Sequence, residues 1–421
     1  MARVEWLNRC DGHAVNGRHA KYLTKEFTLK TVWFLYELIG IFRYKQRLRS
    51  SPPAAPRPVR IGAMTEHLLT LNAGSSSVKF ALFARNAVDA PPEFAGQIDG
   101  IGLGRGGAAT HEEALVDVLA QLNARQVHIG AVGHRIVHGG ACLVEPVLID
   151  DAVVAQINAL VPLAPLHQPH GLAGVRAARH AFAGVPQVAC FDTAFHAGQP
   201  ELNRRFALPQ SLFDAGVRRY GFHGLSYESI MAQLRAADPV RARGRVVIAH
   251  LGNGASMCAL HEGRSVATTM SFSPLDGLPM GTRCGLLDAA AVLHLIQQQG
   301  RSAEDVSRLL YGESGLLGLS GLSSDMRELE ASGLASAAMA INYFVEHALR
   351  ELAAMAAAVR GIDTLVFTGG IGENAAALRA RIVQGSAWMG PVDVQVLRSN
   401  EEAVIAGHTA GCAGGEDKKV V

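Results

Sequence analysis

The sequence predicts an α/β protein in which one structural unit occurs twice. Strand and helix patterns alternate from Met64 onward, which is typical of this fold class. An apolar strand, a turn rich in Gly, Ser or Asn, and a second apolar strand follow one another at His67–Leu82, and the same succession returns at Val246–Leu260. Because each segment has the pattern of a β-hairpin, the recurrence indicates a duplicated domain whose halves each begin with a hairpin.

Further elements follow the hairpins along the chain. Thr364–Phe367 has the pattern of another strand, and it leads into a predicted turn, T-G-G-I-G-E-N, at Thr368–Asn374. Apolar residues at helical spacing predict six helices. They span Glu112–Asn123, Asp151–Leu160, Gly171–Phe182, Ala289–Gln298, Ala335–Val359 and Ala375–Gln384.

The first 63 residues differ from the rest of the chain in composition. They carry 12 Lys and Arg against 4 Asp and Glu, a net charge of +8, whereas the remainder carries −6. Their most apolar stretch, Phe27–Phe42, is too short to span a membrane. A linker-like segment, Ser50–Pro58, follows. We therefore expect residues 1–63 to be a basic extension, which is either disordered or included because the translation start was misassigned. A membrane-surface or targeting segment is the alternative.

The overall composition excludes several classes of function. The formal net charge of +2 gives no general reason to expect a nucleic-acid partner. Six cysteines are scattered singly, without a C-x-x-C pair, which is typical of the reducing cytoplasm rather than of a disulfide framework or a zinc site. We therefore expect a cytoplasmic protein without a membrane partner.

Three turns have the composition of phosphate-binding loops, in which backbone N–H groups approach a phosphate and hydroxyl groups add donors. The first is Asn72–Ser77, with Lys79 two residues beyond it, and the others lie at His250–Ser256 and Thr368–Asn374. The P-loop pattern G-x-x-x-x-G-K-[ST] is absent. One such turn alone is commonly an ordinary hairpin turn, but three together predict a nucleotide cleft between two domains.

Five short stretches combine residues suited to chemistry on anions. Phosphoryl transfer between two anions requires cations around the moving group, which Arg135 and Arg283 supply, with His223 as a further donor. Each of these residues, taken singly, is also compatible with a structural role. Asp192, in the third stretch, is compatible with a helix N-cap. Their position in turns of low charge favours the chemical role. The stretches are Gly133–Gly140, Pro162–His167, Phe191–His196, Tyr220–Gly224 and Pro274–Arg283.

With these motifs in order, the chain resembles the acetate kinase family of the acetate and sugar kinase, heat-shock cognate and actin superfamily. The resemblance runs from about Leu68 to about Ile405. It rests on N-A-G-S-S-S-x-K-F, H-R-x-V-H-G-G, P-L-A-P-L-H, F-D-T-A-F-H, R-x-Y-G-F-H-G, H-L-G-N-G-A-S, L-x-G-L-P-M-G-T-R, S-S-D-M-R, T-G-G-I-G-E-N and N-E-E, which begin at Asn72, His134, Pro162, Phe191, Arg218, His250, Leu275, Ser323, Thr368 and Asn400.

The resemblance implies both a fold and a reaction. The fold is a pair of duplicated actin-like (ribonuclease H-like) ATPase domains with a nucleotide cleft between them. Residues 64–194 with 403–421 would form the acid-binding domain, and residues 195–402 the nucleotide-binding domain. The implied reaction is direct, reversible transfer of the γ-phosphoryl group of ATP to acetate, giving acetyl phosphate and ADP. The family also implies a homodimer.

The family motifs assign roles to residues of this sequence. Catalytic roles fall to Asp192, His223, Arg283 and His167. Arg135 would hold the substrate carboxylate, and Val137, Leu166, Phe222 and Pro274 would enclose the methyl group. The ATP site would take Lys79, His250, Leu251, Gly252, Asn253, Gly254, Asp325, Met326, Arg327, Gly370, Ile371, Gly372, Glu373 and Asn374. Asn72 and Glu401 would hold Mg²⁺, with Mn²⁺ as an alternative ion.

The sequence departs from the family pattern beside one of these residues. The family usually continues S-G-D after the arginine of M-G-T-R, whereas this chain has Cys284, Gly285 and Leu286. We therefore expect a buried carboxylate to be missing beside Arg283. Three alternatives to an acetate kinase stay open: a propionate kinase, a nucleotide-binding switch like actin or the heat-shock ATPases, and an inactive relative.

Overall fold

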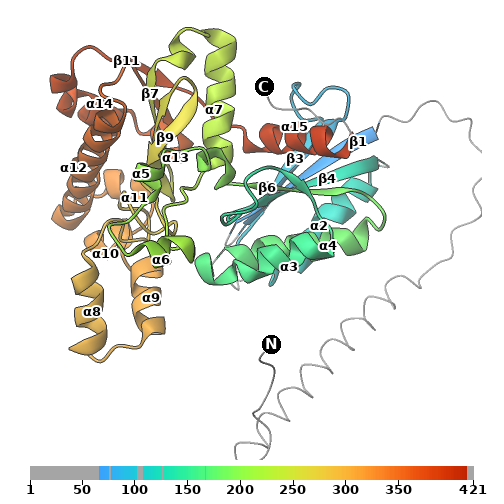
Figure 1. Cartoon of the computed structure of the whole chain (residues 1–421), viewed down its shortest axis with the longest axis horizontal. Coiled ribbons are helices and arrows are strands. Elements are labelled where there is room, and N and C mark those ends of the chain that lie inside the picture. Colours follow the sequence, from blue (N-terminus) through green and yellow to red (C-terminus); the bar gives the residue numbers. More distant parts are fainter. Residues whose placement is uncertain (1–65, 75–76, 102–107, 126, 166, 415–421) are drawn as a thin grey trace, which may run out of the picture. The chain divides into compact units, whose positions relative to one another are not determined.

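The computed structural model describes residues 66–74, 77–101, 108–125, 127–165 and 167–414 (Figure 1). Two β-sheets with helices packed on them make up this part of the chain, which confirms the predicted α/β class. The expected extension at 1–63 lies outside the described residues, as do Leu166 and residues 415–421.

The first sheet is built from β1 (Glu66–Ala73), β2 (Ser77–Ala84), β3 (Phe94–Asp99), β4 (His128–Ile136), β5 (Val147–Leu148) and β6 (Gln187–Phe191). Their order across the sheet is β3-β2-β1-β4-β6-β5. β1 and β2 form the predicted hairpin, and β3 pairs antiparallel with β2. On the other side β4 runs parallel to β1, and β6 runs parallel to β4.

The second sheet repeats this arrangement. It consists of β7 (Arg245–Leu251), β8 (Ala255–His261), β9 (Arg264–Thr268), β10 (Thr364–Thr368) and β11 (Asp393–Val396). The order is β9-β8-β7-β10-β11, with an antiparallel β7–β8–β9 meander and β10 and β11 parallel to β7. Order and strand sense match β3-β2-β1-β4-β6, so the duplication predicted from the two hairpins is confirmed.

Helices cover both faces of the first sheet. They are α2 (His111–Asn123), α3 (Asp151–Ala159), α4 (Gln168–Ala181) and α15 (Glu401–Ala413). Figure 1 shows α15 on one face and α2, α3 and α4 on the other. α15 packs against β1, β4 and β6, so the end of the described chain returns to the sheet with which it began.

The second sheet lies between α7 (Gly224–Ala237) and α12 (Ala335–Ala358). Successive side chains of β7 point to opposite faces, and both faces are apolar. Val246 and Ile248 pack with Ile230 of α7, whereas Val247 packs with Phe344 of α12. This two-sided burial explains why the strand is an almost continuous apolar run in the sequence.

The remaining helices have at most ten residues and follow β6 along the chain. They are α5 (Glu201–Arg204), α6 (Gln210–Asp214), α8 (Ala289–Gln297), α9 (Ala303–Gly312), α10 (Gly315–Ser320), α11 (Met326–Ala331), α13 (Gly369–Asn374) and α14 (Ala376–Gly385), with 3₁₀ turns η1 (Val161–Leu163), η2 (Ala194–His196), η3 (Arg241–Arg243) and η4 (Ala387–Met389). Within the described ranges, no helix is both long and apolar enough to cross a membrane.

All six predicted helices are present, with bounds within three residues of those expected. One expectation was wrong. The segment Thr368–Asn374 was predicted as a turn, but Gly369–Asn374 forms α13. The Glu373 carboxylate accepts a hydrogen bond from the Gly369 N–H at 3.1 Å, and this bond satisfies a donor at the helix start despite the paired glycines.

Candidate active site

Three polar residues of the first sheet meet because their strands are neighbours. β1, β4 and β6 run parallel and side by side, so their carboxyl ends lie at one edge of the sheet. Asn72 is near the end of β1, Arg135 is near the end of β4, and Asp192 directly follows β6. The crevice outside the carboxyl ends of such strands is the usual place for a ligand in an α/β sheet.

Arg135 and Asp192 form a buried ion pair at the centre of this group. Arg135 Nε donates to both carboxylate oxygens at 3.1 Å, and Nη2 donates to Oδ2 at 2.6 Å. Burial raises the pKa of the Asp192 carboxyl, while the Arg135 charge and hydrogen bonds oppose that rise. Burial alone would lower the pKa of Arg135, but the charges of Asp192 and Glu401 raise it overall. The guanidinium therefore stays charged in a fixed orientation.

A second carboxylate reaches the same place from the end of the described chain. Glu401 Oε2, on the first residue of α15, accepts a hydrogen bond from Asn72 Nδ2 at 3.0 Å. Asn72 Oδ1 in turn accepts one from Arg135 Nη1 at 3.1 Å. Burial would raise the pKa of Glu401, but the charges of Arg135 and His250 and the Asn72 hydrogen bond lower it overall. Glu401 is therefore ionised at neutral pH.

These oxygens fit a magnesium ion. Mg²⁺ takes one or two protein oxygens and keeps several waters, which matches the amide oxygen of Asn72 and the carboxylate of Glu401. In the described ranges, no three His, Cys, Asp or Glu side chains gather as a complete metal site. An ion bound between Asn72 and Glu401 would therefore take its other ligands from water and from the phosphates of a nucleotide.

Two stacked histidines lie near these residues. His223, just before α7, has a φ of 58°, a left-handed conformation that is uncommon outside glycine and costly enough to suggest a functional constraint. Its Nδ1 lies 2.8 Å from Ser256 Oγ, and His250 Nδ1 lies 2.8 Å from Ser226 Oγ. The ring centroids are 4.3 Å apart. Because the serines hold both rings by Nδ1, Nε2 is the nitrogen that remains for a ligand.

Burial keeps the histidines of the site neutral at pH 7. It lowers the pKa of His250 to about 4 and that of His223 well below its usual value. His167, just before α4, has its pKa lowered to about 3 by burial and by the charges of Arg283 and Arg135. Its Nδ1 is buried and has no hydrogen-bond partner among the described residues. These side chains therefore act as neutral imidazoles, not as cations.

Arg283 and His223 converge on the turn between β7 and β8. A methyl group built on Gly254 would lie 3.2 Å from His223 Nε2 and 3.4 Å from Arg283 Nη2. Arg283 Nη1 donates to the Pro274 carbonyl at 2.8 Å, which fixes the side chain from the other side. Burial lowers the pKa of Arg283 to about 10, so the guanidinium is charged at neutral pH. A cation and a neutral donor thus face the space at Gly254.

A carboxylate is absent beside Arg283 in the described part of the chain, as expected, but the residue that departs from the family pattern lies outside the site. Leu286 is 60% exposed, so its side chain lies at the surface and not in the site. Within the described part of the chain, no carboxylate contributes to the pKa of Arg283. The Pro274 carbonyl holds the guanidinium instead, so the departure from the family pattern does not place an apolar group beside the charge.

Three of the four residues predicted to enclose a methyl group are buried. Val137 and Phe222 belong to one apolar cluster, and Pro274 is buried beside the Arg283 guanidinium. Leu166, the fourth predicted member, lies outside the described residues.

The residues predicted for ATP lie on β2 and on segments near the strand ends. Lys79 is exposed on β2 and pairs across the hairpin with Asn72, close to the Arg135 group. A methyl group built on Gly252 would lie 3.8 Å from the backbone nitrogen of Gly370, so the turn after β7 and the start of α13 adjoin. Asn374 Nδ2 donates to the Gly370 carbonyl at 2.8 Å. Leu251 is buried in the core, and Asn253, Ile371, Gly372 and Glu373 lie on these same two segments.

The predicted segment Asp325–Arg327 begins α11. Asp325 caps the helix, and its carboxylate pairs with the Arg327 guanidinium, whose side chain is 86% exposed. Met326 between them is 3% exposed and packs in the core. The buried side chain of Met326 is therefore not available to a ligand.

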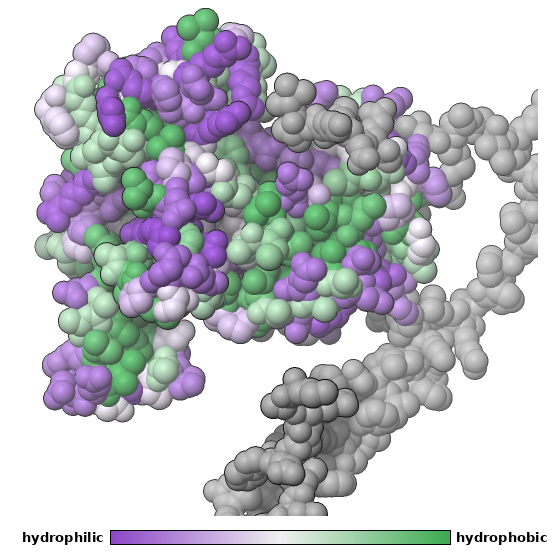
Figure 2. Space-filling model, in the orientation of Figure 1, coloured by the Kyte–Doolittle hydropathy of each residue, from purple (hydrophilic) through white to green (hydrophobic). Residues whose placement is uncertain are grey.

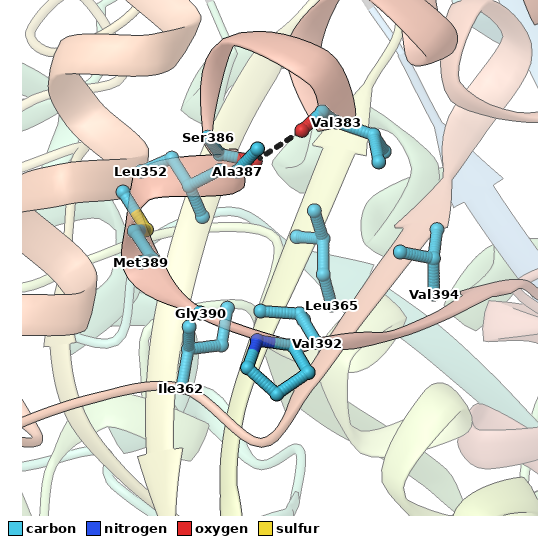
Figure 3. Close-up of a pocket in the computed structure, with 11 residues that line it drawn as sticks. Leu352, Ile362, Leu365, Val383, Ser386, Ala387, Met389, Gly390, Val392 and Val394 are labelled. Carbon is cyan, nitrogen blue, oxygen red and sulfur yellow. Dashed lines mark hydrogen bonds between the residues drawn. The ribbon is translucent and has the colours of Figure 1, made fainter.

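An apolar pocket lies elsewhere and carries none of this chemistry. Its volume is about 450 Å³, and it is lined by α12, α14, β10 and β11 (Figure 3). Ser386 is its one polar side chain among the lining residues, and the Ser386 hydroxyl donates to the Val383 carbonyl at 3.0 Å. No residue predicted for catalysis, substrate or ATP lines it.

Sequence reasoning missed three residues that hold the site together. Ser226 and Ser256 fix the rings of His250 and His223, and Glu402 Oε1 accepts a second hydrogen bond from Asn72 at 3.3 Å. Ser256 closes the motif H-L-G-N-G-A-S and Ser226 follows Y-G-F-H-G, so both lie within two residues of a motif that was already identified.

The fold and the site together define a phosphotransferase. The acetokinase family matches residues 67–411 of the chain. An acetate kinase from Methylocella silvestris is 48% identical over 370 residues, which cover 81% of this chain and 92% of that protein. A propionate kinase from Yersinia enterocolitica is 42% identical over 344 residues, covering 77% and 84% respectively. The chain therefore belongs to the acetokinase family.

Solved structures agree with this assignment. A propionate kinase from Francisella tularensis has a TM-score of 0.76 at 33% identity, and an acetate kinase from Porphyromonas gingivalis has a TM-score of 0.74 at 33% identity. In both cases the likeness covers 82% of this chain and 99% of the other chain.

Proposed function

We propose that the protein catalyses the reversible transfer of the γ-phosphoryl group of ATP to acetate, giving acetyl phosphate and ADP. The observation that carries this proposal is the convergence of Arg283 Nη2 and His223 Nε2 on Gly254. The Arg135 side chain is near both residues, because its charge contributes to lowering the pKa of each. Two guanidinium groups and a neutral donor around one space suit a transition state in which negative charge is spread over phosphoryl oxygens.

The proposed reaction is a direct in-line displacement. A carboxylate oxygen attacks the γ-phosphorus, an O–P bond forms, and the bond from that phosphorus to the bridging oxygen of ADP breaks. Arg135 holds the acid, Asp192 holds Arg135, and Arg283 and His223 stabilise the transferring group. His167 supplies a further neutral donor. Asn72 and Glu401 would hold Mg²⁺, or Mn²⁺ in its place, and a bound ion supplies charge neutralisation on the phosphates.

Propionate is the second candidate substrate. Relatives named as propionate kinases match the chain at 42% identity and, among solved structures, at a TM-score of 0.76. One methylene in an apolar pocket is worth only about 1–3 kcal/mol, so the two acids need not be sharply separated. Burial of Val137, Phe222 and Pro274 supports a small acid in either case.

The test is acyl-phosphate formation by the full chain, trapped with hydroxylamine, with ATP, Mg²⁺ and acetate, propionate or butyrate in parallel. Product that is highest with acetate and falls with chain length supports the proposal. Higher turnover with propionate selects the second candidate. A folded, ATP-binding protein that forms no acyl phosphate with any acid would be a nucleotide-binding switch or an inactive relative, and the kinase proposal would fail.

We further propose a cytoplasmic homodimer. The α8 helix exposes Leu293 and Ile296, and the loop before it exposes Leu286 and Leu287. Figure 2 shows hydrophobic residues on the surface of the α8–α9 hairpin. An apolar surface of this kind is typical of a contact between subunits. The five cysteines of the described chain are free thiols, which fits a reducing compartment.

The domain boundaries are also a proposal. Residues 64–194 with 403–421 would form one domain and residues 195–402 the other. The packing of α15 on the first sheet supports the return of the chain to its first domain.

A further inference from the structure

A small cavity lies beside the active-site segments and is lined by three arginines. Arg204 at the end of α5 and the consecutive Arg218 and Arg219 contribute to its wall, together with Tyr220. None of Arg135, Asp192, His223 and Arg283 lines it. The cavity is therefore distinct from the catalytic site described above.

Two of these arginines have buried donors without partners. The Nε atoms of Arg204 and Arg218 are both shielded from solvent, and neither has a hydrogen-bond partner in the described part of the chain. A buried donor left unpaired costs stability, and the cost is larger for a charged group. Among the described residues, Arg218 Nη2 donates one hydrogen bond, to the Phe213 carbonyl at 3.0 Å, and the guanidinium lies over the Phe213 ring, 4.4 Å from its centroid.

The charges at the cavity are barely compensated by the protein itself. Arg219 Nη1 lies 3.8 Å from Asp276 Oδ2, and this is the one ion pair that the three arginines make among the described residues. Arg204 and Arg218 make no ion pair within the same ranges. An anion in the cavity would satisfy the unpaired Nε donors and the uncompensated charge together.

The size of the cavity limits what it can hold. Its volume is about 40 Å³. That exceeds the roughly 10–15 Å³ that one water requires, but it is far below the several hundred Å³ typical of a site for a nucleotide or another drug-sized ligand. The space suits a few waters or one compact oxoanion such as phosphate.

The cavity also touches three segments that carry the active site. Gly140 ends the stretch that contains Arg135, Thr193 follows Asp192, and Tyr220 lies three residues before His223. The Gly139 N–H already donates to Thr193 Oγ at 3.0 Å, so two of these segments are tied together. An anion bound to Arg204 and Arg218 would add a bridge to the third.

We propose that this cavity binds one small tetrahedral oxoanion, of the inorganic phosphate class, at a site separate from the catalytic one. Occupancy ties the Gly140, Thr193 and Tyr220 segments together and thereby stabilises the folded protein. The site requires both guanidinium groups. Loss of either Arg204 or Arg218 weakens phosphate binding by at least about tenfold.

The experiment measures thermal unfolding of the full chain in phosphate and in chloride at matched ionic strength. Wild type, Arg204→Gln and Arg218→Gln are compared with two controls. Arg301→Gln removes an exposed arginine elsewhere, and Arg283→Gln removes an arginine of the catalytic site. We expect phosphate to raise the midpoint by a few degrees in wild type and in both controls, and not in Arg204→Gln or Arg218→Gln.

A second measurement guards against variants that fold poorly. Crystals of the wild-type protein soaked in selenate should show an anomalous peak within hydrogen-bond distance of Arg204 Nε and Arg218 Nε. The proposal is overturned if the wild type shows no phosphate-dependent shift, if the shift disappears in Arg283→Gln, if it survives in Arg204→Gln and Arg218→Gln, or if selenate does not occupy the cavity.

Discussion

Arg135 and Asp192 face each other across two neighbouring parallel strands, and the guanidinium donates to both carboxylate oxygens at 2.6–3.1 Å. The carboxylate is 1% exposed and the arginine 16% exposed. A fourth hydrogen bond ties the same guanidinium to Asn72. Asp192 therefore serves the site by fixing the direction in which Arg135 presents its remaining N–H groups.

Removal of this carboxylate should impair both turnover and folding. We expect Asp192→Asn to lower turnover by about 10²-fold or more, because Arg135 loses its fixed orientation. It should also cost on the order of 3 kcal/mol of stability, because a buried charge loses its partner. Hydroxylamine trapping and urea unfolding measure the two effects. The matched control is Asp151→Asn in the pair with Arg179, where Asp151 is 93% exposed and little change is expected. A fully active Asp192→Asn enzyme would contradict the role.

Arg283 should matter for the rate and not for the fold. Its guanidinium makes one hydrogen bond to the described protein, to the Pro274 carbonyl, so little native structure depends on it. Loss of a cation that stabilises a transferring phosphoryl group costs about 10³-fold or more in turnover. We expect that loss in Arg283→Ala, with an unfolding midpoint close to that of wild type. Arg301→Ala is the control, and near-normal turnover in Arg283→Ala would exclude the assigned role.

A side chain at position 254 should lower turnover without affecting folding. An alanine methyl group would lie 3.2 Å from His223 Nε2 and 3.4 Å from Arg283 Nη2, in the space proposed for the phosphoryl group. We expect Gly254→Ala to fold normally and to lose about 10- to 100-fold in turnover, since displacement of about 1 Å at a reacting centre has effects of this size. Gly333→Ala is the control, because no atom lies within 4 Å of a methyl group at that position. Equal rates for the two variants would mean that the phosphoryl group passes elsewhere.

The sequence predicted local structure better than it predicted the assembly of the site. The hairpins and helices depend on short-range patterns, and the recurrence of the hairpin predicted the duplicated domain. The contact between Asn72 and Glu401 joins residues 329 positions apart, and the sequence around neither residue predicts it. Glu401 was selected through the family resemblance alone, because the sequence does not distinguish it from a solvated surface glutamate.

The one wrong structural expectation has a physical origin. Thr368–Asn374 looks like a turn because of its paired glycines, yet Glu373 caps the segment and Gly372 is buried against the second sheet, so it folds as α13. In this segment tertiary context overrides the local composition.

Acidification should destabilise the protein through its buried histidines. His134 is 2% exposed, its ring nitrogen lies 2.7 Å from Gln187 Oε1, and burial lowers its pKa from 6.5 to about 4. Because the folded pKa is the lower one, the unfolded chain takes up a proton first as pH falls from about 6.5 to 4. Stability is therefore unaffected above that window and lost within it.

A variant isolates this contribution. Between pH 7 and pH 5 the free energy of unfolding should fall by about 2 kcal/mol less in His134→Gln than in wild type, since each pKa unit corresponds to about 1.4 kcal/mol. Urea unfolding at both pH values measures the difference. His128→Gln, which removes an exposed histidine of the same strand, is the control. Identical pH dependence in wild type and His134→Gln would show that His134 takes up its proton in the folded state.

The proposed dimer leads to the last prediction. Leu293 is 52% exposed and Ile296 is 37% exposed on α8, which has no buried residue of its own in the described chain. Exposure of this apolar surface to water is unfavourable. A second copy of the chain, packed against α8, would bury it. We expect the double variant Leu293→Glu/Ile296→Glu to run as a monomer in light scattering after size exclusion, because a dimer would bring four carboxylates into an apolar contact.

The control for this experiment is Val240→Glu, which alters a side chain that is 82% exposed in another part of the surface. It should leave the dimer intact. Arg283, Arg135 and Asp192 are untouched in the double variant, so residual turnover of the monomer reports whether one subunit carries a complete site. A wild-type protein that is already monomeric would show that there is no dimer. A double variant that still dimerises would show that the subunit contact lies elsewhere. In either case α8 would be an apolar surface without a partner of this kind.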